Sequence, residues 1–305
     1  MVDILLATYN GEKYIKEQLD SIFNQSYSEF KVIIRDDGSI DRTVDIINEY
    51  IRKFGQEKIK LVNDNVACGS PQKNFIRLLS YANSDYVMFC DQDDVWYPNK
   101  IEVTYNAMKK IEYDKNIPIL VYTDYKLVDD NLTDILYNEK KIQIYGKNID
   151  LSHLLVQNYV TGCTMMINRT LYCNVDKFYD EILMHDWWFS IYAASFGLIH
   201  HEKVKTIMYR QHFGQSVGAV NVSGTQYIIS MIKSGKSKTS MQKYVAQAKR
   251  FYVLFNSKMN VNTKNLFLEF ISIPKSCKII RIYKLFRYRF LKSTFARRIG
   301  QIWYV

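Results

Sequence analysis

Cysteine is sparse in this sequence, and its occurrences are scattered. Their number is odd and no pair has C-x-x-C spacing, which argues against a disulfide framework or a zinc site and fits reduced thiols in a cytosolic protein. The positions are Cys68, Cys90, Cys163, Cys173 and Cys277. Long apolar runs are also missing, since no stretch approaches the ~20 residues needed to span a bilayer. The first residues lack the basic leader and small-residue cleavage site of a secretory signal, so we expect a cytosolic location.

The two common glycine-rich phosphate-binding motifs are absent as well. No G-x-G-x-x-G follows the first expected strand, which excludes a dinucleotide-binding dehydrogenase. The run Gly235-Lys236-Ser237 lacks the upstream glycine of a P-loop and comes late in the chain. A diphosphate ligand would therefore need a metal ion to offset its charge.

Acidic residues are absent from residue 275 onward, where nine lysines and arginines occur. The net charge of +10 therefore belongs to this tail, and the rest of the chain is close to neutral. We expect an amphipathic helix over 278–292. Its apolar face carries Ile279, Ile282, Tyr283, Phe286 and Phe290, whereas Leu285 and Leu291 fall off that face.

Three interpretations of this helix are open. It could lie in an anionic membrane surface, pack on its own domain or form a nucleic-acid-binding arm. The lack of acids and the abundance of aromatic residues favour the membrane, and we expect no nucleic-acid partner.

The first part of the chain alternates strand and helix patterns. Expected strands cover 2–8, 30–35, 59–62, 86–90 and 119–123, with a looser one over 159–167. Expected helices cover 12–23, 41–54, 71–82, 98–110 and 185–196, the last stopped by Gly197. This alternation is typical of an α/β fold with a parallel, doubly wound sheet.

Polar residues follow each of the first strands at the point where it ends. They are Tyr9 and Asn10, Asp36 and Asp37, Asn63 to Asn65, and Asp91 to Asp94. Ligands of open α/β sheets bind outside the carboxyl ends of the strands. We therefore expect these residues to converge on one ligand site.

Three carboxylates, Asp91, Asp93 and Asp94, follow the most apolar strand. Asp91 and Asp93 project similarly because side chains of an extended chain alternate with a period of two. Oxygen-only ligands favour Mg²⁺ or Mn²⁺. Asp93 or Asp94 could instead cap the following helix, and it is the converging rim that favours the metal site.

The run His185-Asp186-Trp187-Trp188 opens an expected helix. An acid at the start of a helix has a structural explanation as a cap or a first-turn charge. Two tryptophans beside a His–Asp pair favour a sugar-sized platform instead, since aromatic rings stack on apolar sugar faces. His212 precedes a glycine-rich segment that resembles an active-site lid, although a lone histidine is more often structural.

With these residues in view, the chain resembles the family 2 glycosyltransferases of the GT-A fold, and most closely their bacterial rhamnosyltransferase branch. The resemblance covers about residues 4–218 and rests on five motifs in the family's order. They are L-A-T-Y-N-G-E-K-Y at 6–14, R-D-D-G-S-I-D-R-T at 35–43, D-Q-D-D-V-W at 91–96, H-D-W-W at 185–188 and Y-R-Q-H at 209–212. It implies a Rossmann-like, mostly parallel sheet flanked by helices. A GT-A catalytic domain would span 1–218 and a helical, basic, membrane-associating extension 219–305.

The resemblance also implies roles for individual residues. Nucleotide-sugar binding falls to Ala7, Tyr9, Asp37, Lys73, Asp91 and Asp94, with the first three at the base, Lys73 at the diphosphate and Asp91 at the ribose. Asp93 would hold the metal ion, and His212 would reach the metal or the diphosphate. Asp186 matches the catalytic base, with His185 where the family usually has an acid. His185, Trp187 and Trp188 would line the acceptor or sugar pocket.

We therefore expect an inverting glycosyltransferase dependent on Mn²⁺ or Mg²⁺. Its reaction would move L-rhamnose from dTDP-rhamnose to a lipid-linked saccharide at the inner face of the cell membrane, for capsule or cell-wall polysaccharide. One alternative is a hexosyltransferase with a UDP-sugar donor. Another is a non-catalytic nucleotide-sugar-binding protein, against which the intact Asp91, Asp93 and Asp186 argue.

Overall fold

A computed structural model of the chain describes residues 1–64, 66–135, 149–175, 181–212 and 236–305. The chain divides into two compact units. Unit 1 comprises residues 1–137, 160–178 and 197–218, and unit 2 comprises 138–159, 179–196 and 219–305. The expected catalytic domain over 1–218 and extension over 219–305 are functional divisions, and they stay a prediction.

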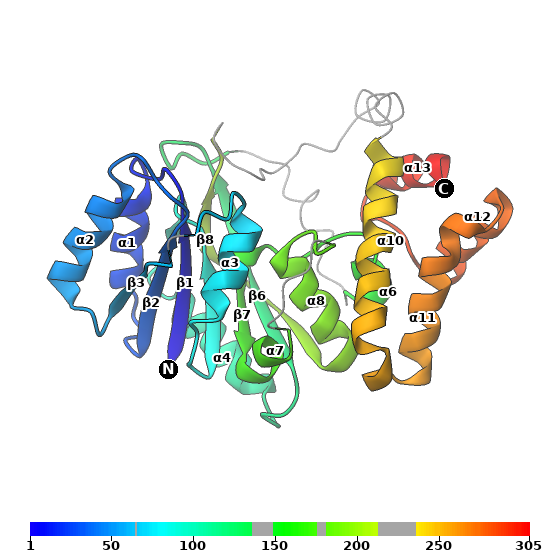
Figure 1. The fold of residues 1–305 in the computed structure, drawn as a ribbon, viewed down its shortest axis with the longest axis horizontal. Helices are drawn as coiled ribbons and strands as arrows, with labels where there is room; N and C mark the ends of the chain where they lie inside the picture. Colours follow the sequence, from blue (N-terminus) through cyan, green and yellow to red (C-terminus); the bar gives the residue numbers. More distant parts are fainter. Residues whose placement is uncertain (65, 136–148, 176–180, 213–235) are drawn as a thin grey trace. The chain divides into compact units, whose positions relative to one another are not determined.

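Unit 1 is built on one eight-stranded sheet (Figure 1). Its strands are β1 (Val2–Thr8), β2 (Phe30–Asp36), β3 (Ile59–Val62), β4 (Tyr86–Cys90), β5 (Val95–Trp96), β6 (Ile119–Val128), β7 (Met165–Asn168) and β8 (Leu198–Arg210). They lie in the order β3-β2-β1-β4-β7-β6-β8-β5. The pairs β1–β2, β1–β4, β2–β3 and β6–β8 are parallel, whereas β7 is antiparallel to both of its neighbours. The expected α/β class with a mostly parallel sheet is confirmed.

The strand order reverses at β1, because β2 and β3 lie on one side of it and β4 lies on the other. Thr8 pairs with Asp36, and Leu6 pairs with Cys90, so these parallel strands end at a common edge. The residues that follow β1, β2 and β4 therefore share one rim, as expected. Such a reversal of strand order is where open α/β sheets bind ligands.

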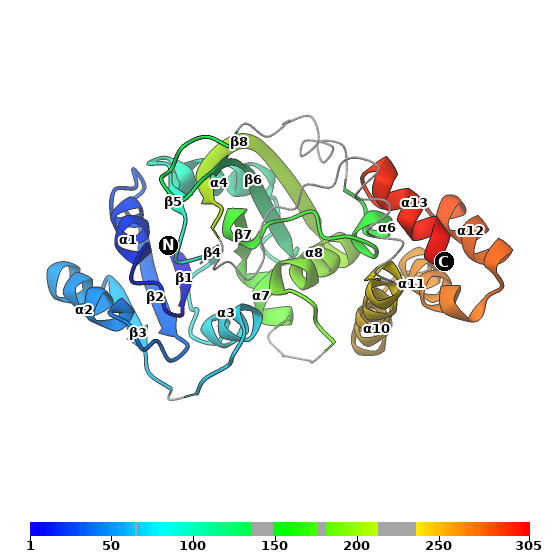
Figure 2. The ribbon, with the colours of Figure 1, turned by 90° about the horizontal axis from the view of Figure 1, so that it is seen from above.

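Helices cover both faces of this parallel half (Figure 2). They are α1 (Ile15–Phe23), α2 (Thr43–Phe54), α3 (Pro71–Leu79) and α4 (Lys100–Ile111), and a short α7 (Arg169–Asn174) follows β7. Ile4 and Leu6 of β1 belong to the buried cluster that includes α1, α2 and α4. Phe75 of α3 meets Phe89 of β4 edge-on, with ring centroids 5.7 Å apart. Burial on both faces explains why β4 is a continuous apolar run.

Most expected elements are confirmed within a few residues, and three differ. The strand expected over 119–123 continues to Val128 as β6. The chain over 159–167 is not one strand, because a 3₁₀ turn at Gly162–Thr164 precedes β7. The helix expected over 278–292 ends earlier, as α12 (Lys278–Arg287), and Arg289 then has a positive φ of 57°. An α-helix cannot continue through a left-handed residue, so the chain turns there.

Gly197 directly follows helix α8 (His185–Phe196), so the helix stops where expected, and the glycine does not have the positive φ of a left-handed cap. A Cβ placed on Gly197 would stand 1.8 Å from the carbonyl oxygen of Pro118. The next residue, Leu198, donates its N–H to that same oxygen at 2.9 Å. Glycine is required here because two backbone segments approach closely as β8 begins beside β6.

Unit 2 is helical in its described part. It contains α6 (Leu151–Leu154), α8, α10 (Lys236–Phe255), α11 (Val261–Ser272), α12 and α13 (Phe295–Tyr304). Trp188 of α8 meets Phe251 of α10 edge-on at 5.0 Å, and Phe251 stacks on Phe267 of α11 at 5.2 Å. Over the residues described, none of the helices combines the length and the apolar character that crossing a membrane requires.

Candidate active site

The loop from Asp91 to Asp94, called here the aspartate loop, connects β4 to β5 at the rim of unit 1. Asp94 is fully buried, and burial together with the charges of Asp93 and Asp91 raises its pKa well above the ordinary value. Its Oδ1 accepts a hydrogen bond from the backbone N–H of Arg210 at 3.1 Å. Its Oδ2 is buried without a hydrogen-bond partner in the described part of the chain. Such an atom is costly to bury, and a bound cation would satisfy it.

Cys163 adds a sulfur atom beside these carboxylates. Its Sγ and one oxygen each of Asp91 and Asp94 lie within 4.8 Å of one another. Burial raises the pKa of the Cys163 thiol well above its ordinary value. Because hard divalent cations prefer oxygen ligands to sulfur, we expect the carboxylates rather than Cys163 to bind a cation.

The end of β8 holds the aspartate loop in place. The Nε atom of Arg210 donates to the backbone oxygen of Asp93 at 2.8 Å. Its two other nitrogens donate to the backbone oxygen of Asp130 and to the carboxylate of Glu17. One buried guanidinium therefore ties the aspartate loop to α1 and to the chain after β6.

His212 lies directly against the same loop. Its Nε2 atom is 2.8 Å from Oδ2 of Asp93, and its ring packs on that of Tyr14 with centroids 4.6 Å apart. Asp93 and His212, the two residues implied as metal contacts, are thus brought together. Carboxylate oxygens with one imidazole nitrogen suit a hard divalent cation such as Mn²⁺. These residues fit the expected metal, although their roles as ligands stay a prediction.

The turn after β1 is bound to the aspartate loop by Gln92. Its Oε1 accepts the backbone N–H of Tyr9 at 2.8 Å, and its Nε2 donates to the backbone oxygen of Tyr9 at 2.9 Å. A Cβ on Gly11 would lie 2.3 Å from that Oε1, so the glycine leaves room for the amide. Ala7 is half-buried near the end of β1, and the side chain of Tyr9 is exposed.

Asp37 follows β2 on the same rim. It is buried, and its carboxylate accepts the backbone N–H groups of Cys68 at 2.5 Å and Gly69 at 2.8 Å. Lys73 lies in the first turn of α3, is exposed, and donates its backbone N–H to the capping Oγ of Ser70 at 3.3 Å. The residues implied for the nucleotide therefore lie on the rim or at the start of α3.

Asp186 belongs to unit 2 and lies in the first turn of α8, as expected from the sequence. It is buried, and its Oδ1 accepts the backbone N–H of Trp187 at 2.6 Å. Burial lowers the pKa of the preceding His185 to about 3, so this imidazole is neutral at neutral pH. His185 therefore adds no charge beside Asp186, unlike the acid found there in the family.

The two tryptophans are core residues of unit 2. Trp187 is 6% exposed and donates its Nε1–H to the backbone oxygen of Leu154 at 2.5 Å. Trp188 is 1% exposed and packs against α10. A sugar could stack on Trp188 only by displacing aromatic side chains of that helix, so these contacts do not favour the platform.

Several residues of the rim were not singled out from the sequence. Gln92 and Arg210 lie inside quoted motifs, so their positions in D-Q-D-D and Y-R-Q-H were the available signal. Asp130 gave no signal, because it meets Lys13 and Tyr14 only through tertiary packing. Arg35 was visible only as the first letter of R-D-D-G-S.

The fold and rim define an α/β protein with a carboxylate-rich site where the strand order reverses. The family model for glycosyl transferase family 2 matches residues 3–173, which is more than half of the chain. The chain therefore belongs to glycosyltransferase family 2.

Curated relatives agree with this assignment. An uncharacterized glycosyltransferase of Rickettsia prowazekii is 33% identical over 208 residues, 66% of this chain and 62% of the relative. The dTDP-rhamnosyl transferase RfbG of Shigella flexneri is 29% identical over 233 residues, 72% of this chain and 75% of the relative. An Escherichia coli enzyme named UDP-Glc:alpha-D-GlcNAc-diphosphoundecaprenol beta-1,3-glucosyltransferase is 28% identical over 172 residues, 56% of this chain and 61% of the relative. The chain spans 62% of the length of this Rickettsia prowazekii relative and of a second relative from Rickettsia typhi.

Solved structures confirm the GT-A-type fold. Staphylococcus aureus TarS 1–349 in complex with UDP has a TM-score of 0.57 at 18% identity, covering 99% of this chain and 88% of that one. The mannosyltransferase of Pyrobaculum calidifontis in complex with GDP-Man and Mn²⁺ has a TM-score of 0.56 at 15% identity, covering 97% and 76%.

Proposed function

We propose that this chain is an inverting, metal-dependent glycosyltransferase that uses a nucleotide-diphosphate sugar as donor. The observation that carries the proposal is the aspartate loop at the reversal of strand order. There Asp93 is paired with His212, and Asp94 buries an oxygen that has no partner within the described ranges.

For the donor we propose dTDP-L-rhamnose. The relative from Shigella, named a dTDP-rhamnosyl transferase, supports this choice, and it is matched over most of both chains. The alternative is a hexose from a UDP-sugar, which the name of the Escherichia relative supports. That name also supports a lipid-linked acceptor, as in capsule or cell-wall polysaccharide synthesis.

The chemistry follows from charge development in the transition state. As the anomeric carbon becomes oxocarbenium-like, negative charge grows on the departing nucleotide diphosphate. Mn²⁺ or Mg²⁺ held by Asp93 and His212 would neutralise that charge as a Lewis acid. The base of the donor is oriented by Ala7, Tyr9 and Asp37. The ribose is contacted by Asp91 and the diphosphate by Lys73, and Asp94 supports the metal ligand Asp93.

Asp186 is the proposed general base. It accepts the proton of the acceptor hydroxyl as that oxygen attacks the anomeric carbon. One base and one leaving group on opposite faces of the sugar give a single displacement, so the anomeric configuration inverts. The neutral His185 beside it does not compete for that proton, because its pKa lies far below neutral pH.

The first experiment measures nucleotide-diphosphate release from a panel of dTDP-, UDP- and GDP-sugars, with Mn²⁺ or with chelator, in the presence of lipid-linked acceptors. We expect release from one donor only, dependent on metal, and abolished in Asp93→Ala and Asp186→Asn. Asp45→Asn, at an exposed position of α2, is the matched control and should keep full activity. Donor binding without release would favour the non-catalytic alternative, and no binding at all would overturn the assignment.

We also propose that unit 2 contacts an anionic membrane surface through α12. Ile279, Tyr283 and Phe286 are 80%, 61% and 55% exposed, and their spacing places them on one face of the helix. Two basic residues face the unit instead: Arg281 donates to the backbone oxygen of Val305 at 3.1 Å, and Lys284 contacts Glu269 at 2.8 Å.

This outward apolar stripe differs in detail from the expected one. Phe290, expected on the same face, is buried beyond the end of α12, and Leu285 is the buried residue of the helix. Exposed cations lie along the same stretch of sequence: Lys275, Lys278, Arg287, Arg289 and Arg298. Apolar side chains among cations, without acids, suit an anionic lipid surface.

Flotation with vesicles tests this surface. We expect the protein to float with phosphatidylglycerol vesicles and not with phosphatidylcholine vesicles, and Tyr283→Glu with Phe286→Glu to abolish flotation. Val261→Glu, at an exposed apolar position of α11, is the control. Binding to DNA or RNA that weakens steeply with salt, without flotation, would support the nucleic-acid alternative instead.

A further inference from the structure

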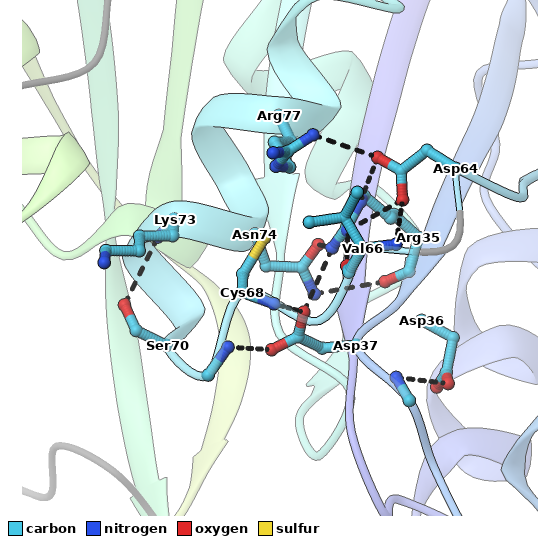
Figure 3. A network of polar contacts seen from close by, with 12 residues as sticks. Arg35, Asp36, Asp37, Asp64, Val66, Cys68, Ser70, Lys73, Asn74 and Arg77 are labelled. Carbon is cyan, nitrogen blue, oxygen red and sulfur yellow. Dashed lines mark hydrogen bonds and ion pairs between the residues drawn. The ribbon is translucent and has the colours of Figure 1, made fainter.

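Arg35, near the end of β2, is a fully buried cation whose N–H donors are all used (Figure 3). Its Nε and Nη2 donate to the two oxygens of Asp64 at 3.0 and 2.8 Å. Its Nη1 donates to Oδ1 of Asp37 at 3.2 Å and to Oδ1 of Asn74 at 2.9 Å. Its Nη2 also donates to the backbone oxygen of Val66. A guanidinium has five N–H donors, and each of them has an acceptor here.

These acceptors come from three segments that are separate in the chain. Asp37 follows β2, Asp64 and Val66 lie in the loop between β3 and α3, and Asn74 is in α3. Asn74 also donates its Nδ2–H back to the carbonyl oxygen of Arg35 at 3.2 Å. One side chain therefore fixes a strand end, a loop and a helix relative to one another.

The carboxylate of Asp37 joins the same network from its other side. Its Oδ1 accepts from Arg35 and from the N–H of Cys68, and its Oδ2 accepts from the N–H of Gly69. Gly69 has a φ of +66°, a value that glycine adopts without strain. Arg35 therefore contacts Oδ1 and leaves Oδ2 to other donors.

A buried cation is an expensive way to stabilise a fold. The desolvation of buried charges can exceed their mutual attraction, so apolar residues of similar volume often serve stability as well. An apolar side chain cannot, however, orient a carboxylate. Hydrogen bonding to Arg35 lowers the pKa of Asp64, because the guanidinium stabilises the ionised carboxylate.

We infer that Arg35 is the positioning residue of the nucleotide-base pocket. It holds the Asp37 carboxylate in the orientation in which this carboxylate binds the base of the donor. The backbone at 68–69, which donates hydrogen bonds to Asp37, is held in place with it. This inference rests on the proposed function, in which Asp37 contacts the base. The ligand chemistry is a base whose ring offers an N–H to Oδ2, as uracil, thymine and guanine do, whereas the ring N3 atom of cytosine is an acceptor.

The test compares affinities for dTDP, UDP, GDP and CDP by calorimetry in the presence of Mn²⁺. Wild-type protein should bind its best diphosphate more tightly than CDP. Arg35→Lys should lower the ratio of these two affinities at least tenfold, because lysine cannot make the planar contacts of a guanidinium. Asp64→Asn leaves Arg35 in place but weakens the pair of hydrogen bonds that its guanidinium makes to residue 64. This variant should also lower the ratio. If Arg35→Lys does not fold, the affinity ratio of Asp64→Asn tests the inference instead.

Asp3→Asn is the matched control. Asp3 is also a buried carboxylate that accepts backbone N–H groups, from Asn83 at 2.7 Å and Ser84 at 2.8 Å, but it lies at the opposite end of β1. It should lower thermal stability without changing the ratio. An unchanged ratio in folded Arg35→Lys or in Asp64→Asn, or no preference in the wild type, overturns the inference alone. A wild type that binds no diphosphate overturns the proposed function together with it.

Discussion

Replacing Arg210 by lysine tests how β8 holds the aspartate loop. The side chain of Arg210 is 3% exposed, and it donates to the backbone oxygens of Asp93 and Asp130. Its third contact is with Glu17, whose side chain is 53% exposed. Lysine keeps the charge but has no planar fork, so it cannot reach these acceptors together.

The magnitude follows from the contacts that are lost. A hydrogen bond from a charged group contributes about 1.5–3 kcal/mol, and an ion pair with a half-exposed carboxylate about 0–1 kcal/mol. If lysine retains one backbone contact and loses the other two contacts, the net loss is roughly 1.5–4 kcal/mol. Expressed entirely as weaker metal binding, that corresponds to a roughly 10- to 700-fold higher half-saturating concentration of Mn²⁺.

The assay is a Mn²⁺ titration of nucleotide-diphosphate release, with urea unfolding of the same protein. Arg169→Lys is the matched control, because Arg169 also donates to a backbone carbonyl, that of Asn83 at 2.8 Å, away from the aspartate loop. The control should stay within twofold of wild type. If Arg210→Lys matches wild type in both Mn²⁺ half-saturation and urea midpoint, the proposed hold on Asp93 is refuted.

Three further predictions concern charge, space and metal. Burial lowers the pKa of His185 to about 3, so its imidazole stays neutral in the folded protein at mildly acidic pH. In the unfolded chain the same imidazole has its ordinary pKa of about 6.5 and takes up a proton below that pH. Protonation of this group should therefore lower the free energy of unfolding by roughly 2 kcal/mol between pH 7 and pH 5. The urea midpoint of His185→Gln should not show this decrease. Gly197→Ala should destabilise unit 1 by about 2–3 kcal/mol in thermal unfolding, because its Cβ would collide with the carbonyl oxygen of Pro118. Asp93→Asn should raise the half-saturating Mn²⁺ concentration of nucleotide release at least tenfold, and unchanged metal dependence would remove Asp93 from the proposed ligands.

Much of the fold follows from local pattern. The strands 2–8, 59–62 and 86–90 were predicted with the bounds that the structure has, since each is an apolar run closed by polar turn residues. The region over 159–167 was predicted less well. Its apolar residues are buried by tertiary packing whether the backbone is extended or in a 3₁₀ turn, so hydrophobicity alone does not distinguish the two.

The candidate site was predictable in part for a related reason. Asp37 and the aspartate loop follow strands, so the topology of a parallel sheet brings them to one rim. Gln92, Arg210 and Arg35 act through hydrogen bonds that cross long stretches of sequence, and no local pattern indicates those partners. The tryptophans of α8 suggested a sugar platform by their residue type, and no local pattern indicates that neighbouring helices bury both rings. Their role in an acceptor or sugar pocket stays a prediction.

The alternation of strands and helices, the polar rim at the strand ends and the family could all be predicted from the amino-acid sequence alone. Those features depend on residue types at short spacing, which the chain carries in any conformation. Which of the polar residues contact one another could be seen only in the folded chain. The fold paired Asp93 with His212, buried Arg35 among carboxylates, and turned Tyr283 and Phe286 outward. The physical reason is that burial and hydrogen-bond partnership depend on which segments pack together, and that packing is set by the whole fold.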